Sequence, residues 1–155
     1  MSEGNKLSQT MRIKIDADSD APVTRRMPSI RARSFSTRLP VKARLSPGEN
    51  TLYQQFMKSI YDAVLITDPQ GALVDANGRA YEFFLYDLDE LCAKTIFDIV
   101  CGFNAVVLGT IISNLKNERF TLIEACCRRQ DQTLFHAEIA TSLLHLGQAP
   151  HLCFF

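Results

Sequence analysis

The stretch AVLITDPQGALVDANGRAYEFF, residues 63–84, decides the fold of this chain. Two short apolar runs in it, 63–67 and 72–76, predict two strands. Between these runs Pro69 presets its own φ and Gly71 admits a positive φ, so the chain can reverse direction there. We therefore expect a strand, a tight turn and a second strand.

A helix should follow the second strand directly. Asp75 or Asn77 can accept hydrogen bonds from the first free amides of a helix that begins near Gly78. Apolar residues then recur on one face of that helix at the expected spacing: Ala80, Phe83 and Phe84.

The rest of the chain alternates between helical and extended patterns. Residues 87–100 predict two short helices, and Asn104 can cap a longer apolar helix over residues 105–117. Three stretches then predict strands: 120–128, 133–144 and 151–155. In the first, Thr121, Ile123, Ala125 and Cys127 should point inward, and in the second Phe135, Ala137, Ile139, Thr141 and Leu143.

These patterns predict an α+β domain with a five-stranded antiparallel sheet and helices packed on one face. An amphipathic helix over residues 50–61 should precede it, with apolar side chains on every fourth position.

The order and the types of the residues in 63–84, together with those that follow, resemble the opening of a PAS sensory domain. That family typically shows an Asp-x-x-Gly turn, a strand ending in Asn, a helix carrying Ala, and then a Glu-Leu-x-Gly-Lys run before a short apolar helix. The matching residues here are Asp68, Gly71, Asn77, Ala80, Tyr86, Glu90, Leu91, Lys94, Ile96 and Phe97, followed by Asp98, Ile99 and Val100. Leu85 and Ala93 stand where the family usually has Gly, which is tolerable where the backbone does not need positive φ. The resemblance covers roughly residues 53–155.

Charge divides the chain into two parts. Residues 1–48 carry ten Lys and Arg against four Asp and Glu, about +6, whereas residues 49–155 carry seven against thirteen, about −6. The first part has little apolar surface apart from residues 11–15, which alternate like a strand, so we expect a basic disordered tail or linker. It could instead be a basic arm that contacts nucleic acid, anionic lipid, the acidic domain itself or a protein partner, or be phosphorylated at Ser29 or Ser36; we predict no nucleic-acid partner.

The location expected from composition is cytoplasmic. No run approaches the roughly 20 apolar residues of a membrane helix, so no membrane span is predicted, and no apolar signal segment stands at the N-terminus. The five cysteines should then be reduced thiols, and their spacing does not favour a metal site.

No catalytic motif is present, and we expect no enzyme activity. The chain has no Gly-rich phosphate loop and no Gly-x-Ser-x-Gly, and its three histidines are expected to be solvated.

The resemblance also bears on cofactors. Haem-binding PAS domains use a His on or near the long helix, and residues 105–117 contain none. The photoactive flavin branch needs a reactive Cys where this chain has Thr95, Ile96 and Phe97. Both cofactors are therefore argued against, and none is predicted.

A cavity between sheet and helices is the candidate binding site. Small side chains leave room there for a small apolar ligand such as a fatty acid or an aromatic ring. Because the site has no polar anchors, however, the sequence favours a core in which neighbouring side chains fill the space. The candidate lining is Ile96, Phe97, Leu108, Ile112, Ile123, Ala125, Cys127, Ala137, Ile139 and Phe154.

The resemblance implies a non-enzymatic sensory and dimerisation module of a signalling protein. It would act as a homodimer and pass its signal through the flanking helix and the last strand to an output domain or partner protein. The chain ends inside that strand, so we expect it to be a fragment of a longer sensor. A ligand-binding sensor and a scaffold that uses the basic arm are the alternatives. The candidate dimer helix residues are Leu52, Tyr53, Phe56, Met57 and Ile60.

Overall fold

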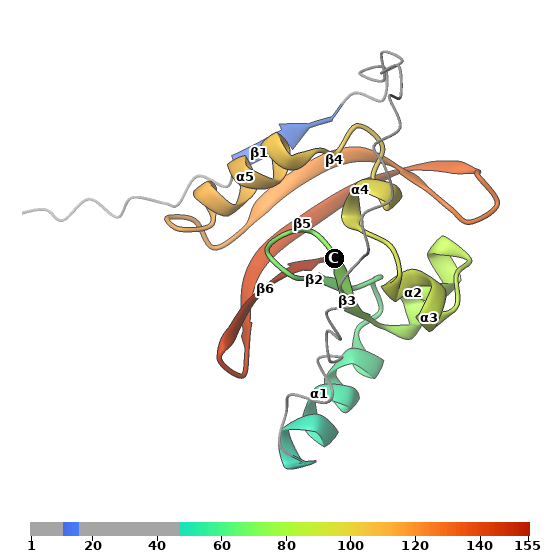
Figure 1. Cartoon of the computed structure of the whole chain (residues 1–155), viewed down its shortest axis with the longest axis vertical. Coiled ribbons are helices and arrows are strands. Elements are labelled where there is room, and N and C mark those ends of the chain that lie inside the picture. The colour runs from blue at the N-terminus through green and yellow to red at the C-terminus, as the bar shows by residue number, and fades with distance from the viewer. Residues whose placement is uncertain (1–10, 16–46) are drawn as a thin grey trace, which may run out of the picture.

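The structure is a computed structural model that describes residues 11–15 and 47–155. One mixed sheet curves around the helices (Figure 1). Its strands are β1 (Met11–Lys14), β2 (Leu65–Thr67), β3 (Leu73–Ala76), β4 (Thr121–Arg128), β5 (Leu134–Leu146) and β6 (Ala149–Phe154). The helices are α1 (Pro47–Ser59), α2 (Gly78–Phe84), α3 (Leu88–Cys92), α4 (Ile96–Ile99) and α5 (Ala105–Asn114).

The strand order is β1-β4-β5-β6-β2-β3. Strands β2 to β6 pair in antiparallel fashion, which confirms the predicted α+β fold and its five strands. The sheet also has a sixth strand, because β1 pairs parallel with β4 from Met11 opposite Thr121 onward.

Strand β1 corrects the prediction that all of residues 1–48 form a disordered tail or linker. Ile13 packs against the core, Ile15 is buried in it, and the Ile15 amide donates a hydrogen bond of 2.9 Å to the Glu124 carbonyl. Burial of these two isoleucines offsets the entropy of ordering the segment. Residues 1–10 and 16–46, with Ser29, Ser36 and most of the arginines of the basic arm, lie outside the described residues.

The predicted turn after β2 is confirmed. The Asp68 carboxylate accepts hydrogen bonds from the amides of Gln70 and Ala72, at 3.0 and 2.9 Å. Gly71 has φ of +87°, and a Cβ there would lie 3.1 Å from side-chain atoms of Ile96 and Phe97. The position therefore requires glycine for its backbone and for the close packing of α4 on the turn.

Asn77 joins β2, β3 and α2. Its side-chain oxygen accepts hydrogen bonds from the Ala80 amide (3.0 Å), which caps α2, and from the Val64 amide (2.9 Å). Its side-chain amide donates to the Asp62 carbonyl at 2.8 Å. Of the two predicted cap residues, Asn77 is thus the cap, and its buried side chain also fixes the segment that leads into β2.

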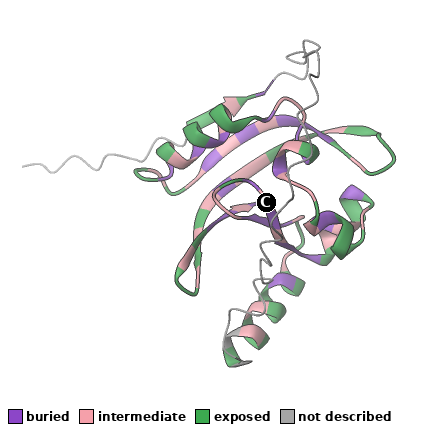
Figure 2. Ribbon diagram, in the orientation of Figure 1, coloured by how far each residue is buried: buried purple, intermediate pink, exposed green. Residues whose placement is uncertain are grey.

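The sheet has two apolar faces, and helices cover both. The front face carries Leu65, Ile123 and Leu152 and packs against α2 to α5. The other, here called the α1 face, carries Val64, Ile66 and Cys153 and packs against Met57 of α1. The prediction of helices on one face therefore holds for α2 to α5 only. Figure 2 shows that most of α1 is exposed or half-buried.

Leu143 was expected to point into the core, but 42% of its surface is exposed. Strand β4 pairs with β5 only as far as Thr141, so Leu143 has no β4 residue beside it. Further along β5, Leu144 and Leu146 pack on the α1 face instead.

The two positions where the resemblance expects glycine differ in backbone conformation. We therefore predict that substitution by glycine changes the stability of the domain in opposite directions at the two positions. Leu85 has φ of +60° and is half-exposed, whereas Ala93 has a helical φ of −81°. A left-handed conformation costs an L-residue about 1–2 kcal/mol, and the entropic cost of glycine is about 0.5–1 kcal/mol. Leu85→Gly should therefore raise the free energy of unfolding in urea by about 0.5–1 kcal/mol.

Ala93→Gly is the matched control and should lower that free energy by up to about 1 kcal/mol. A destabilised Leu85→Gly variant would show that residue 85 is not held in the left-handed conformation in solution.

Candidate functional site

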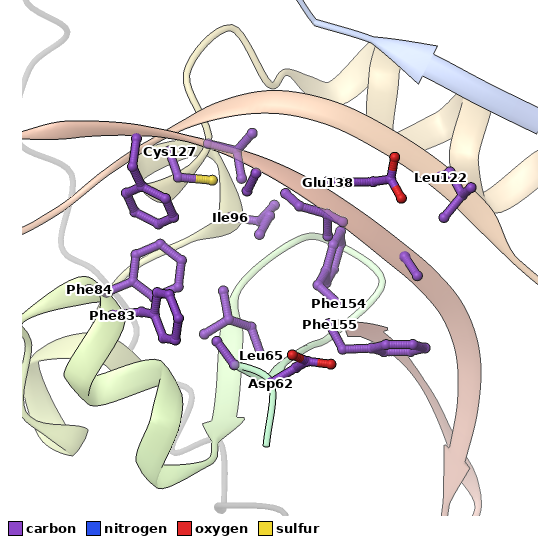
Figure 3. A pocket seen from close by; sticks show the side chains of 16 residues that line it. Asp62, Leu65, Phe83, Phe84, Ile96, Leu122, Cys127, Glu138, Phe154 and Phe155 are labelled. Carbon is purple, nitrogen blue, oxygen red and sulfur yellow. The ribbon is translucent and has the colours of Figure 1, made fainter. Parts of the chain in front are cut away.

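A cavity of about 370 Å³ lies between β5, the segment before β2, and α2 (Figure 3). Strand β5 pairs with β6 from Thr141 to Leu146, and the Ala140 and Phe155 backbones exchange hydrogen bonds of 2.7 and 3.0 Å. The other half of β5, residues 134–139, has no described strand paired with it on the side where β6 lies. The cavity occupies the space beside this part of β5.

The interior of the cavity is apolar and largely aromatic. The Phe84 and Phe135 rings are 5.5 Å apart and Phe83 is 6.3 Å from Phe135, so these three form one wall. The charged residues that line it are acidic, Asp62 and Glu138. The remaining lining residues are Ala63, Leu65, Ile96, Val100, Leu122, Cys127, Ala137, Ile139, Ala140, Phe154 and Phe155.

Half of the ten predicted cavity residues line this space. Ile96, Cys127, Ala137, Ile139 and Phe154 do so. The other five lie elsewhere in the packed front-face core: Leu108, Ile123 and Ala125 are buried there, and Phe97 and Ile112 are half-buried against it.

The aromatic wall was missed by the sequence analysis. The sequence analysis placed Phe83 and Phe84 on one apolar face of α2 and Phe135 on the inward face of its strand. Phe84 and Phe135 do pack in the front-face core, whereas Phe83 is 39% exposed. Their gathering at one cavity depends on how far β6 extends along β5, which no local pattern encodes.

The one thiol in the lining of the cavity is not activated. Burial raises the pKa of the Cys127 thiol to about 12, so this residue stays protonated and is a poor nucleophile at neutral pH. Within residues 11–15 and 47–155, no three His, Cys, Asp or Glu side chains gather to hold a metal ion. No helix in those ranges is long and apolar enough to span a membrane.

His151 was predicted to be solvated but is buried, with 1% of its surface exposed. Its Nδ1 lies 2.9 Å from the Ala149 carbonyl oxygen. Strand register places it opposite Leu144, on the α1 face rather than in the turn.

Helix α1 has two apolar sides. Of the predicted dimer residues, Tyr53, Met57 and Ile60 pack on the sheet, whereas Leu52 and Phe56 are 70% and 61% exposed. The exposed pair is four residues apart and therefore on one side of the helix.

One hydrogen bond anchors α1 to the sheet. The Tyr53 hydroxyl donates to Oδ2 of the buried Asp75 at 2.9 Å, and the Ala76 amide donates to Oδ1 at 2.9 Å. Burial, and then the Asp75 carboxylate, raise the pKa of Tyr53, so its hydroxyl remains a donor. A β-bulge between Ile66 and Thr67 puts Asp75 on the α1 face.

Comparison with known proteins agrees with this architecture. A PAS domain family profile matches residues 51–138, more than half of the chain. The comparison with curated protein sequences gave no significant match.

Solved PAS domains share the fold at low sequence identity. The PAS domain of the HTR-like protein from Haloarcula marismortui is 17% identical, with a TM-score of 0.61 over 69% of this chain and 88% of that one. A domain of the sensory box sensor histidine kinase/response regulator from Geobacter sulfurreducens is 19% identical, with a TM-score of 0.57 over 68% and 91%. The PAS domain of nitrogen regulation protein NR(II) from Vibrio parahaemolyticus is 14% identical, with a TM-score of 0.55 over 66% and 94%.

A larger side chain should be accepted at the cavity and rejected in the packed core. Ala137→Leu adds three carbons beside open volume, so we expect the free energy of unfolding to change by less than about 1 kcal/mol. Ala80→Leu makes the same change at a fully buried residue and should cost about 1–3 kcal/mol in urea unfolding. Equal costs for the two variants would mean that the cavity is filled in solution.

Removal of the Tyr53 hydroxyl should loosen α1. Tyr53→Phe leaves the Asp75 carboxylate without its phenolic donor, so we expect a loss of about 1–3 kcal/mol in urea unfolding. Tyr61→Phe is the control, because Tyr61 is 79% exposed and its loss should stay within about 0.5 kcal/mol. A Tyr53→Phe variant as stable as the Tyr61→Phe control would contradict the anchoring role of this hydrogen bond.

Proposed function

Because this chain belongs to the PAS domain family, we propose that it is a sensory and dimerisation module of a signal-transduction protein. PAS domains are generally non-enzymatic sensory modules, and relatives in fold include parts of sensor histidine kinases. The proposal includes a cytoplasmic location and coupling to an output domain or partner protein.

The observation that carries this proposal is a connection between the cavity and α1. Asp62 and Ala63 line the cavity, and only residues 60 and 61 separate them from the end of α1 at Ser59. The Asp62 carbonyl and the Val64 amide are both held by Asn77. A change in occupancy or packing of the cavity therefore acts on the segment that positions α1.

The relay requires two arrangements of α1 with different affinities for a ligand or partner. Tyr53 and Asp75 hold one arrangement through a single hydrogen bond between side chains. Disturbing that bond, or the segment at residues 60–64, would shift the balance between the two arrangements. The end of the last strand, β6, would respond to the cavity in the same way, because Phe154 and the next residue, Phe155, also line it.

Dimerisation would use the free side of α1. Leu52 and Phe56 present two large apolar side chains to solvent, and a second copy of the helix would bury both pairs about a shared axis. Each buried side chain of this size contributes roughly 1.5–3 kcal/mol.

Binding of a small apolar ligand is a second candidate function, favoured by the aromatic wall. Because Asp62 and Glu138 are the charged lining residues, a carboxylate ligand such as a fatty acid would meet like charge, and a neutral aromatic ring fits better. Haem and photoactive flavin are not part of this proposal. Native mass spectrometry and an absorption spectrum of protein purified from cells test it: extra mass supports a ligand, and bare protein under both methods counts against one.

Charged residues on the exposed side of α1 should break the dimer. Leu52→Glu with Phe56→Glu buries two carboxylates in the proposed interface, so we expect the dimer mass to fall to the monomer mass in light scattering. Leu134→Glu is the control, since Leu134 is 54% exposed at the start of β5, far along the sheet from α1.

The variant chains should keep the circular dichroism of the original, because both α1 positions are mostly exposed. A dimer that survives the double substitution would place the interface elsewhere, and a monomeric original chain would refute dimerisation.

A further inference from the structure

Cys101 and Cys126 lie side by side at the outer edge of β4. The Cys101 amide donates a hydrogen bond of 2.8 Å to the Cys126 carbonyl, and Val100 forms an antiparallel bridge with Cys127. Cys101 and Cys126 are therefore opposite residues of an antiparallel pair. Such residues have Cα atoms about 4.5–5.5 Å apart, inside the range of about 4.4–6.8 Å that a disulfide spans.

The two side chains share one face of the sheet. Opposite residues of an antiparallel pair point to the same side, whereas Cys127, the next residue, points to the opposite face and lines the large cavity. All five cysteines are reduced thiols in the structure. Two cysteines opposite each other on antiparallel segments therefore have the backbone separation that a disulfide spans.

An oxidant can reach this pair through Cys101. Cys126 is buried, with 7% of its surface exposed, but Cys101 is half-buried and opens into a cavity of about 160 Å³. Polar groups line that cavity, among them Asp98, Asn104 and Arg128. Cys101 is the more exposed of the two residues and lines this cavity, so it meets the oxidant first.

We propose that Cys101 and Cys126 are an oxidation site that forms a reversible disulfide on reaction with a hydroperoxide. The Cys101 thiolate attacks one peroxide oxygen, the O–O bond breaks, and with hydrogen peroxide Cys101 becomes a sulfenic acid while water leaves. The Cys126 sulfur then displaces the hydroxyl group, the S–S bond forms, and a second water leaves. The two thiols are oxidised by two electrons in total, and the peroxide is reduced by the same two.

The disulfide would fix the connection between α4 and α5 to β4. That connection contains Gly102, whose φ is +71°, and it follows β1 along the same edge of β4, where Ile15 bonds to Glu124. The proposal rests on these contacts alone and is independent of ligand binding and of dimerisation.

Tryptic peptides of the full chain test the proposal cleanly. Residues 95–116 form a peptide whose single cysteine is Cys101, and residues 120–128 form one that holds Cys126 and Cys127. After treatment with hydrogen peroxide and blocking of thiols with N-ethylmaleimide, we expect these two peptides to be joined and to separate with dithiothreitol.

Serine variants identify which two cysteines form the disulfide. Cys126→Ser and Cys101→Ser should each abolish the joined peptide, and Cys127→Ser should retain it. If Cys126→Ser fails to fold, Cys101→Ser at the half-buried position provides the same test. A link through Cys127, a link between two chains only, or oxidation to sulfinic acid without a link would each overturn the proposal.

Discussion

The buried amide of Asn77 is the constraint on which the rest of the structure depends. It accepts hydrogen bonds from the Val64 and Ala80 amides and donates one to the Asp62 carbonyl. One side chain thus satisfies backbone groups of the segment before β2 and of the first turn of α2, where the Asn77 backbone amide also donates to the Val64 carbonyl. Without it, buried polar groups would remain unpaired, at a cost of about 1–3 kcal/mol each. The site proposed for signalling is built around this junction, because Asp62 also lines the cavity and leads back to α1.

Under the proposed function, one face of the sheet contributes mainly to stability and the other to signalling. The front face holds the closed core under α2 to α5, and the α1 face holds a smaller cluster around Met57, Val64 and Ile66. A small cluster and one Tyr53–Asp75 hydrogen bond bind α1 less firmly than a core would, which suits an element that changes position. The β-bulge that turns Asp75 toward α1 therefore belongs to the proposed relay as well as to the sheet.

Local chemistry predicted the local structure well. The turn of Asp68 and Gly71, the caps at Asn77 and Asn104, and the inward residues of β4 all follow from short-range rules. Features that depend on distant partners did not follow. Strand β1 exists because β4, more than a hundred residues later, offers it an edge, and Leu85 takes a positive φ because α2 must end there. The place of the cavity depends on where β6 stops along β5, so the sequence analysis named only five of its sixteen lining residues.

Equilibrium unfolding in urea of two asparagine-to-alanine variants tests the central role of Asn77 most directly. Asn104 caps α5 through its side-chain oxygen and is exposed, so Asn104→Ala should cost about 0.5–2 kcal/mol, as a lost cap does. Asn77→Ala removes a cap and leaves the Val64 amide and the Asp62 carbonyl without their partner, so it should cost at least about 3 kcal/mol. Equal losses for the two variants would contradict the account, since Asn77 would then be no more than a helix cap.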